Sequence, residues 1–308
     1  MSLVVLQPGL QCTVQAAPRT GFRHAGVPKS GPADAVSMAL ANRLVGRAPS
    51  DACLEITFGA AQFRFETSMQ IGVAGAATGI RIGGVEHHAH QTLDVEAGEI
   101  VEIAPVTTGA RVYLGVSGAL QAQSFLGSAS TYLPAAFGGI EGRALRTGDR
   151  IEVKAVRALR PVATPEALRF PILQSFALRV VPGPDLPDPA NFPWAETFTV
   201  SSRLSRMGVE IEGRLPVPET GGSLPSSAVS PGALQVTPQG LGYLLLVDGQ
   251  TTGGYPHLLQ VIRADRHLLG QLRPGSRIRF LYRTQECAEA DLHAKQAMLE
   301  HWLPGFRL

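Results

Sequence analysis

Cysteine is scarce in this sequence, which has three in 308 residues: Cys12, Cys53 and Cys287. They lie far apart and form no C-x-x-C pair, so neither a disulfide framework nor a zinc ribbon is indicated. Excess charge is also missing, because 27 Lys and Arg side chains stand against 25 Asp and Glu, a formal net charge of +2. This small balance gives no argument for a nucleic-acid or membrane partner.

Long hydrophobic runs are absent as well. No segment approaches the roughly 20 apolar residues that cross a bilayer as a helix. The stretch MSLVVLQPGLQC (1–12) lacks the basic region and the long apolar core of a signal peptide. Gln11, directly before Cys12, argues against lipid attachment at that cysteine. We therefore expect a cytoplasmic protein.

Hydrophobic residues are nonetheless plentiful, at 44%, and 34 glycines and 23 prolines are scattered without a period. This composition indicates a packed core with a chain that turns frequently. Short β-branched or alternating runs lie between the turns and are typical of sandwich or barrel strands. The clearest runs are 61–66, 92–105, 111–118 and 150–156. The sequence predicts a mainly β fold.

Two stretches have helical periodicity. The first, 34–47, begins at Asp34, a residue type that caps helix N-termini, and has apolar residues one turn apart. The second, 284–303, is expected to close over a barrel or to meet a partner chain. Its apolar stripe consists of Ala288, Leu292, Leu299 and Trp302.

A weak internal repeat links ALRTGDRIEV (144–153) with QLRPGSRIRF (271–280). Both have the pattern L-R-x-G-x-R-I, which predicts a tight turn that leads into a strand. The proline-containing stretch 157–174 lies between them and suits a linker. We expect two related β-rich domains, residues 1–165 and 166–308.

Several short blocks follow one another along nearly the whole chain. They are GVPKSGPAD (26–34), ANRLVGR (41–47), LEITFG (54–59), LGSASTY (126–132), GRALRTGD (142–149), SRMG (205–208), SPGALQV (230–236) and DGQTTGGYP (248–256). In this order they resemble the allophanate hydrolase subunit 2 family, also described as a biotin-dependent carboxyltransferase or KipA-like family. The C subunit of bacterial 5-oxoprolinase belongs to it. The resemblance implies two cyclophilin-like β-barrel domains with a few short helices and a C-terminal helix.

The resemblance also implies a function. The expected protein is one subunit of a hetero-oligomeric, ATP-dependent amidohydrolase, above all 5-oxoprolinase, which opens 5-oxoproline to glutamate. Its partners would be an allophanate hydrolase subunit 1-like protein (the B-type component of 5-oxoprolinase) and a protein like the A-type component, and ATP would act with these partners. One alternative is a biotin-dependent carboxyltransferase subunit for urea or a related amide. Another is a non-enzymatic protein that binds and blocks a kinase inhibitor.

The block DGQTTGGYP (248–256) is the first candidate binding site. Its glycines let main-chain N–H groups approach a ligand, and its threonine hydroxyls can donate or accept beside them. Such a loop suits a carboxylate, carbamate or phosphate group, although a turn-capping hairpin has the same composition. Asp248 would orient an arginine or act as a base. The residues expected to be catalytic here are Asp248 and Thr252, and those expected to bind substrate are Thr251, Gly253, Gly254 and Tyr255.

Residues from other blocks are expected to converge on the same cleft. Ser30 and Asp34 precede a helix whose N-terminal amides attract anions, and Asp34 would equally serve as the cap. Arg206 would clamp a substrate carboxylate as a catalytic group, or else form a salt bridge. Gln235, on an apolar strand, needs polar partners. Together with Arg19, the residues Ser30, Asp34 and Gln235 complete the expected substrate-binding set.

Three carboxylates of the family pattern are missing. Ala16, Ser205 and Ser227 stand at positions where relatives carry acids. If those acids balance Arg19 and Arg206 in relatives, the site here is more positive. A diverged relative with weak or no activity is the alternative.

The sequence has no complete motif for binding a metal ion or a nucleotide. His88 and His90 in HHAH (87–90) would share one strand face, but no third ligand is visible, so we expect exposed hairpin histidines and no metal. Neither a G-x-S-x-G elbow nor a P-loop is present. Any nucleotide is therefore expected on a partner or at an unfamiliar site.

Overall fold

The computed structural model describes residues 1–186, 188–217 and 224–308. Main-chain contacts divide the chain into two compact units. The first unit consists of Met1–Arg19, Ser30–Ile172 and Leu299–Arg307, and the second of Thr20–Lys29, Leu173–Met298 and Leu308. Each unit is therefore discontinuous in sequence. None of the helices in the described residues has both the length and the hydrophobicity of a transmembrane span.

The strands of the first unit form two sheets. The seven-stranded sheet has the order β11-β12-β1-β4-β9-β6-β7 and the five-stranded sheet the order β2-β3-β10-β5-β8. The strands of the larger sheet are β1 (Ser2–Pro8), β4 (Ala61–Phe65), β6 (Ile80–Ile82), β7 (Val85–His87), β9 (Ile100–Ile103), β11 (Ala119–Leu120) and β12 (Arg150–Lys154). Those of the smaller sheet are β2 (Gln11–Gln15), β3 (Cys53–Thr57), β5 (Met69–Ala77), β8 (Thr92–Val95) and β10 (Thr108–Val116).

Alternating side chains from both sheets fill one core. In β12, Ile151 and Val153 are buried in this core while the charged residues between and beside them are exposed. This is the two-residue period of a strand that has one face on the core. Two short 3-10 helices, η2 (Leu133–Ala135) and η3 (Glu166–Leu168), lie in the loops of this unit.

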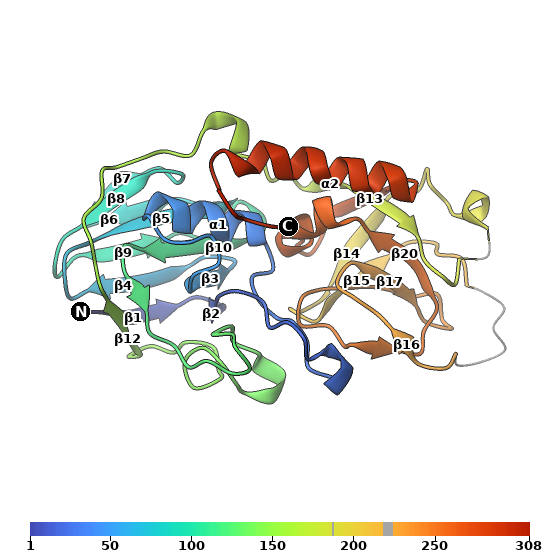
Figure 1. Cartoon of the computed structure of the whole chain (residues 1–308), viewed down its shortest axis with the longest axis horizontal. Helices are drawn as coiled ribbons and strands as arrows, with labels where there is room; N and C mark the ends of the chain where they lie inside the picture. Colours follow the sequence, from blue (N-terminus) through green and yellow to red (C-terminus); the bar gives the residue numbers. More distant parts are fainter. Residues whose placement is uncertain (187, 218–223) are drawn as a thin grey trace. The chain divides into compact units, whose positions relative to one another are not determined.

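Helix α1 (Ala35–Leu44) packs on β5 and β10 of the first unit (Figure 1). It begins at Asp34, whose carboxylate accepts from the Ser37 N–H at 2.9 Å and from the Ser37 hydroxyl at 2.5 Å. Gly72 and Gly115 allow the close packing, because an added Cβ would lie 2.5 Å and 3.0 Å from the Ala41 carbonyl oxygen. The predicted cap is therefore confirmed.

The strands of the second unit close into a barrel of order β13-β20-β17-β18-β15-β14-β21. The last strand pairs with the first in parallel, and the other neighbouring strands pair antiparallel. The barrel strands are β13 (Ser175–Pro182), β14 (Phe198–Leu204), β15 (Gly208–Glu212), β17 (Ala233–Val236), β18 (Gly242–Leu245), β20 (His257–Val261) and β21 (Arg277–Tyr282). A two-stranded ribbon, β16 (Ser227–Ala228) with β19 (Thr252–Gly253), and the 3-10 helices η1 (Arg23–Ala25), η4 (Pro189–Asn191) and η5 (Arg263–Gln271) complete the unit.

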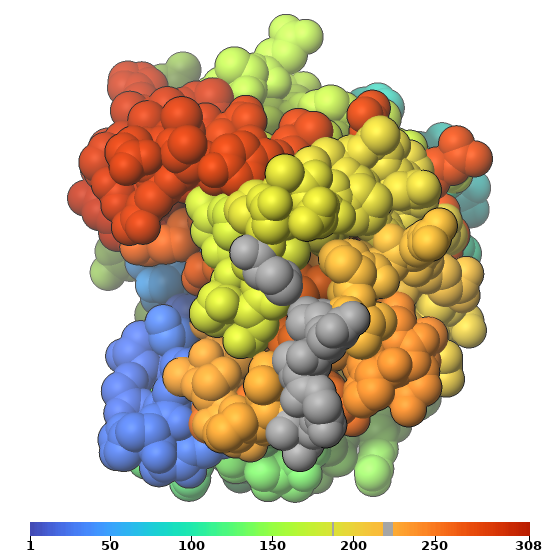
Figure 2. Space-filling view, turned by 90° about the vertical axis from the view of Figure 1, so that its right-hand side faces the viewer, coloured from blue at the N-terminus to red at the C-terminus, as the bar shows by residue number. Residues whose placement is uncertain are grey.

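The C-terminal helix α2 (Gln285–Glu300) is largely exposed and is drawn in red in Figure 2. Asp291 anchors it to the barrel, because its oxygens accept from Arg179 of β13 at 2.7 Å and from Arg283 at 3.0 Å. Lys295 contacts the ring of His267 in η5 at 2.9 Å. The helix therefore lies against the barrel of its unit. Of the two expectations, closure over a barrel or contact with a partner chain, the structure shows the first.

The mainly β class is confirmed, and both helices and the strands expected at 61–66, 111–118 and 150–156 are present with ends shifted by a few residues. The run 92–105 instead contains two strands, β8 and β9, which belong to different sheets because the chain turns between them. A closed barrel is present in the second unit, whereas the strands of the first unit form two sheets around one core.

The two copies of the repeat have the same local structure. The Asp149 N–H donates to the Arg146 oxygen at 3.1 Å, and the Ser276 N–H donates to the Arg273 oxygen at 3.0 Å. Each turn is followed by a strand, β12 or β21. However, β12 pairs with the first strand of its unit antiparallel, and β21 pairs with β13 in parallel. Domain duplication therefore stays a prediction.

Candidate active site

A cavity of about 430 Å³ opens on the barrel of the second unit. It is lined by Arg203, Leu204, Ser205, Met207, Gly208, Gln235, Tyr243, Leu245, Gln250 and Tyr255. Two of the predicted site residues, Gln235 and Tyr255, are therefore in one cavity wall. A larger cavity of about 600 Å³ lies over β6 and β9 of the first unit, and its described lining includes no predicted site residue.

A row of polar side chains on three neighbouring strands supports this cavity. Gln235 of β17 lies directly opposite Tyr243 of β18, which lies opposite Glu210 of β15. The Tyr243 hydroxyl donates to Glu210 Oε2 at 2.7 Å, and Arg203 donates to Glu210 Oε1 at 2.6 Å. Successive residues of a strand point to opposite faces, so the row is on the face away from the barrel core, into which Leu244 packs.

The side-chain amide of Gln235 is held rigidly in this wall. The residue is 1% exposed, its Nε2 donates to the Tyr255 carbonyl at 2.9 Å, and its Oε1 accepts from Gln250 Nε2 at 3.0 Å. Gly253 makes room for this amide, because an added Cβ would lie 2.5 Å from Gln235 Nε2. Its φ is not in the positive region. The glycine is therefore needed for the close approach of a protein amide.

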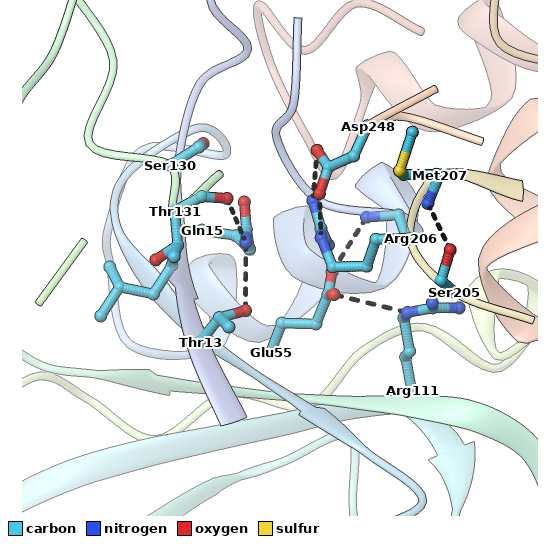
Figure 3. Close-up of polar contacts among 12 residues, drawn as sticks. Thr13, Gln15, Glu55, Arg111, Ser130, Thr131, Ser205, Arg206, Met207 and Asp248 are labelled. Carbon is cyan, nitrogen blue, oxygen red and sulfur yellow. Dashed lines mark hydrogen bonds and ion pairs between the residues drawn. The ribbon is translucent and has the colours of Figure 1, made fainter. Parts of the chain in front are cut away.

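Asp248 and Arg206 form a buried ion pair in the second unit (Figure 3). Arg206 Nε donates to Asp248 Oδ2 at 2.7 Å, and Nη2 donates to Oδ1 at 3.3 Å. Both side chains are almost fully buried, at 3% and 1% exposure. Of the two roles expected for Asp248, the structure shows the orientation of an arginine.

The threonines of the same block lie outside the described lining of the cavity. Thr251 is buried, and its carbonyl accepts from the Val229 N–H at 3.1 Å. Thr252 is exposed on β19, where it pairs with Ala228. Gly254 accepts a main-chain hydrogen bond from Leu224 at 3.2 Å. Their predicted contacts with a ligand stay predictions.

The predicted residues of the first unit are all buried. Arg19 donates to the main-chain oxygens of Phe125 and Ser130 and stacks over the Phe137 ring, 4.8 Å from its centroid. The Ser30 hydroxyl is buried with no hydrogen-bond partner among the described residues, and its φ is 51°. Asp34 caps α1, as described above. Their convergence with Arg206 on one cleft stays a prediction.

Sequence reasoning missed Gln250, which donates to the Gln235 amide. It also missed three residues that bond to one another on the neighbouring strands, namely Arg203, Glu210 and Tyr243. Gln250 lies inside the DGQTTGGYP block, where the threonines are the more conspicuous hydrogen-bonding residues. The other three come together beside the partner strand of Gln235 only through strand register, which the sequence does not display.

The positions with missing acids differ in their surroundings. The Ser205 hydroxyl lines the cavity and accepts from the Met207 N–H at 3.1 Å (Figure 3). Ser227 is exposed on β16, and Ala16 is buried in the first unit. Only the change at residue 205 therefore removes a carboxylate from the wall of this cavity.

The HHAH stretch does not have the expected strand geometry. Strand β7 ends at His87, His88 follows outside the strand, and His90 lies in a bend with a φ of 66°. The two histidines therefore do not share a strand face. Burial, with the charge of Arg169 as a lesser cause, lowers the pKa of His90 to about 4.

The carboxyl of Glu210 makes the stability of this wall pH-dependent. Burial alone would raise its pKa, but hydrogen bonds from Tyr243 and Arg203 outweigh burial and hold the pKa below its usual 4.5. A lowered carboxyl pKa stabilises the fold above the unfolded-state pKa, and this contribution is lost as the pH falls through the folded-state pKa. We expect Glu210→Gln to have a lower free energy of unfolding than wild type. The difference should be largest at neutral pH and should shrink as the pH falls below 4.5. Urea denaturation of both proteins across this range is the measurement, and a constant difference would contradict the role of the charge.

The comparisons with known proteins agree with the fold. Residues 25–282 match the family model described as carboxyltransferase domain, subdomain A and B. The chain is 31% identical over 299 residues to the C subunit of 5-oxoprolinase from Escherichia coli (strain K12), with 96% of this chain and 94% of that protein covered. It is 30% identical over 306 residues to urea amidolyase of Saccharomyces cerevisiae, with 91% and 16% covered. The solved structure of the K. lactis urea amidolyase superposes with a TM-score of 0.91 at 28% identity, over 100% of this chain and 20% of that chain.

Proposed function

This chain belongs to the family described as carboxyltransferase domain, subdomain A and B, and from this premise we propose that it is one component of a 5-oxoprolinase. The observation that supports this choice is the extent of the match. The alignment covers 94% of the 5-oxoprolinase relative, compared with 20% of the urea amidolyase structure. The reaction would be the opening of 5-oxoproline to glutamate by an assembled complex.

The cavity on the barrel would receive the lactam. The Gln235 amide is fixed by Tyr255 and Gln250, so it is positioned before a ligand arrives. Gln250 uses an N–H of its amide on Gln235, and its Oε1 is therefore available to a lactam N–H. Arg203 engages Glu210 through Nε and Nη2, which leaves Nη1 for a substrate carboxylate. Hydrogen bonds that are in place beforehand lose less entropy when the substrate binds.

ATP would supply phosphorylation of the lactam oxygen, which makes an unstrained amide a better electrophile. The cavity lining consists mainly of amides, phenols and apolar side chains, with Arg203 as its cation. That set fits a small amide rather than a triphosphate. The proposal therefore assigns ATP to the complex with A-type and B-type partner proteins.

A biotin-dependent carboxyltransferase role is the second candidate. The TM-score of 0.91 with a urea amidolyase over the whole chain favours it. The same Gln235 and Gln250 amides would suit the ureido group of biotin or urea, because both groups present N–H donors beside a carbonyl acceptor.

Co-purification with candidate partners and an assay of the complex will test the proposal. We expect the chain to co-purify with the B-type and A-type proteins encoded by the same organism. The complex should release glutamate from 5-oxoproline in the presence of ATP, and the chain alone should not. A stable complex that instead transfers carboxyl from carboxybiotin to urea, and leaves 5-oxoproline intact, would favour the second candidate.

A further inference from the structure

Four cationic side chains gather at one place in the second unit. Two belong to the segment 20–29 and two to η5: Arg23, Lys29, Arg263 and Arg266. Among the residues that the structure describes, none of the four has a carboxylate side chain as a partner. The Arg23 and Arg263 guanidiniums donate to the main-chain oxygens of Val229 and Leu308, and Arg266 Nε donates to the Val261 oxygen at 3.4 Å.

Two of the guanidiniums, those of Arg23 and Arg266, donate to residues at one hydrogen-bonded turn. Val229 and Val261, which accept from Arg23 and Arg266, flank the turn Ser230–Gly232. This turn is fixed to β20, because the Val261 N–H donates to the Gly232 oxygen at 2.8 Å and the Gln260 amide donates to the Pro231 oxygen at 3.0 Å. It is the start of the SPGALQV block (230–236), and Ser230, Pro231 and Gly232 are not part of the described cavity lining.

The four positive charges of the cluster repel one another. Partial burial of the Lys29 side chain, followed by the charges of Arg23, Arg266 and Arg263, lowers its pKa. Burial, followed by the charges of Arg263 and Arg23, lowers the pKa of Arg266 to about 10. Arg23 Nη1 is buried with no hydrogen-bond partner among the described atoms. Asp265, the acid between the two arginines of η5, is engaged by Arg179 at 2.6 Å.

We propose that Arg23, Lys29, Arg263 and Arg266 bind a multiply charged phosphate group, such as pyrophosphate or the polyphosphate end of a nucleotide. One carboxylate would neutralise one of four cations, whereas a diphosphate carries several negative charges and many acceptor oxygens. The planar guanidinium fork pairs with phosphate oxygens through two N–H groups at a time, and this geometry favours phosphate over a compact anion. The assignment uses contacts within the second unit and does not rest on the proposed function.

Calorimetric titration of the purified chain with pyrophosphate is the test. We expect saturable binding that weakens as salt is added, because salt screens exposed charges. Lys29→Gln removes an exposed charge that holds no other described residue in place, so it should leave the fold intact and weaken binding about tenfold. Arg23→Gln should weaken pyrophosphate binding by at least the same factor. Arg279→Gln, a matched change on the exposed face of β21, should leave the affinity unchanged.

Three results would overturn the assignment. They are absence of pyrophosphate binding, equal affinities for Lys29→Gln and Arg279→Gln, and competition by glutamate as strong as that by pyrophosphate. A titration with ATP separates the sources of the phosphate group. Tighter binding of ATP than of pyrophosphate supports a nucleotide polyphosphate, whereas ATP binding without pyrophosphate binding would place recognition on the nucleoside and contradict the role of the cations.

Discussion

Asp248→Asn is expected to lower the free energy of unfolding of the second unit by about 3–5 kcal/mol, the range measured when one partner of a buried ion pair is removed. The substitution keeps the size of the side chain but removes the charge opposite Arg206. Since Arg206 is 4% exposed, water cannot replace the lost carboxylate at the 2.7 Å contact.

Tryptophan fluorescence can follow this unit by itself. The sequence has two tryptophans, of which Trp194 is in the second unit and Trp302 in the first. In a Trp302→Phe background, urea denaturation monitored through Trp194 reports the unit that contains Asp248. Glu212→Gln is the matched control, because it makes the same change on an exposed residue and should alter stability by less than about 0.5 kcal/mol. Equal midpoints for the two variants would show that the ion pair does not stabilise the fold.

This prediction changes how Asp248 is understood. The sequence placed an acid at the end of a strand beside two threonines, a pattern that suits a general base. In the structure, both carboxylate oxygens of Asp248 accept hydrogen bonds from Arg206. An acid held in this way fixes the position of the arginine.

Elements that depend on local chemistry were predictable from the sequence. Asp34 caps α1 because its carboxylate reaches an N–H three residues away, and that spacing is visible in the sequence. The turns at Gly148 and Gly275 were equally visible, since each requires a positive φ directly before a strand.

The cavity depends on register and was not predictable in the same way. Gln235, Tyr243 and Glu210 become neighbours because β17, β18 and β15 pair in one particular alignment. A shift of one residue would turn Gln235 into the barrel core. Barrel closure, including the parallel pair of β13 and β21, fixes that alignment. The matching blocks identified Gln235 and Tyr255, but they carried no information about Arg203 or Glu210.

Gly253→Val is expected to have the largest effect on activity. Its Cβ would lie 2.5 Å from Gln235 Nε2 and 2.8 Å from Oε1, so the amide must leave the Tyr255 carbonyl and Gln250. A displacement of about 1 Å in a positioning group can cost on the order of a hundredfold in rate, and we expect a loss of that size in kcat/KM of the reconstituted complex. The matched control is Gly79→Val in the first unit, where the nearest atom to an added Cβ is 3.6 Å away.

A double variant separates the loss of positioning from damage to the fold. Gln235→Ala removes the amide that the valine would strike, so Gly253→Val should destabilise the Gln235→Ala protein less than it destabilises wild type. The activity of the double variant should nevertheless stay low, because the amide that we propose to orient the substrate is gone. If Gly253→Val left kcat/KM unchanged while the complex stayed intact, the Gln235 amide would not position the substrate. Full activity in Gln235→Ala would lead to the same conclusion, and the glycine would then serve only the packing of β19 beside β17.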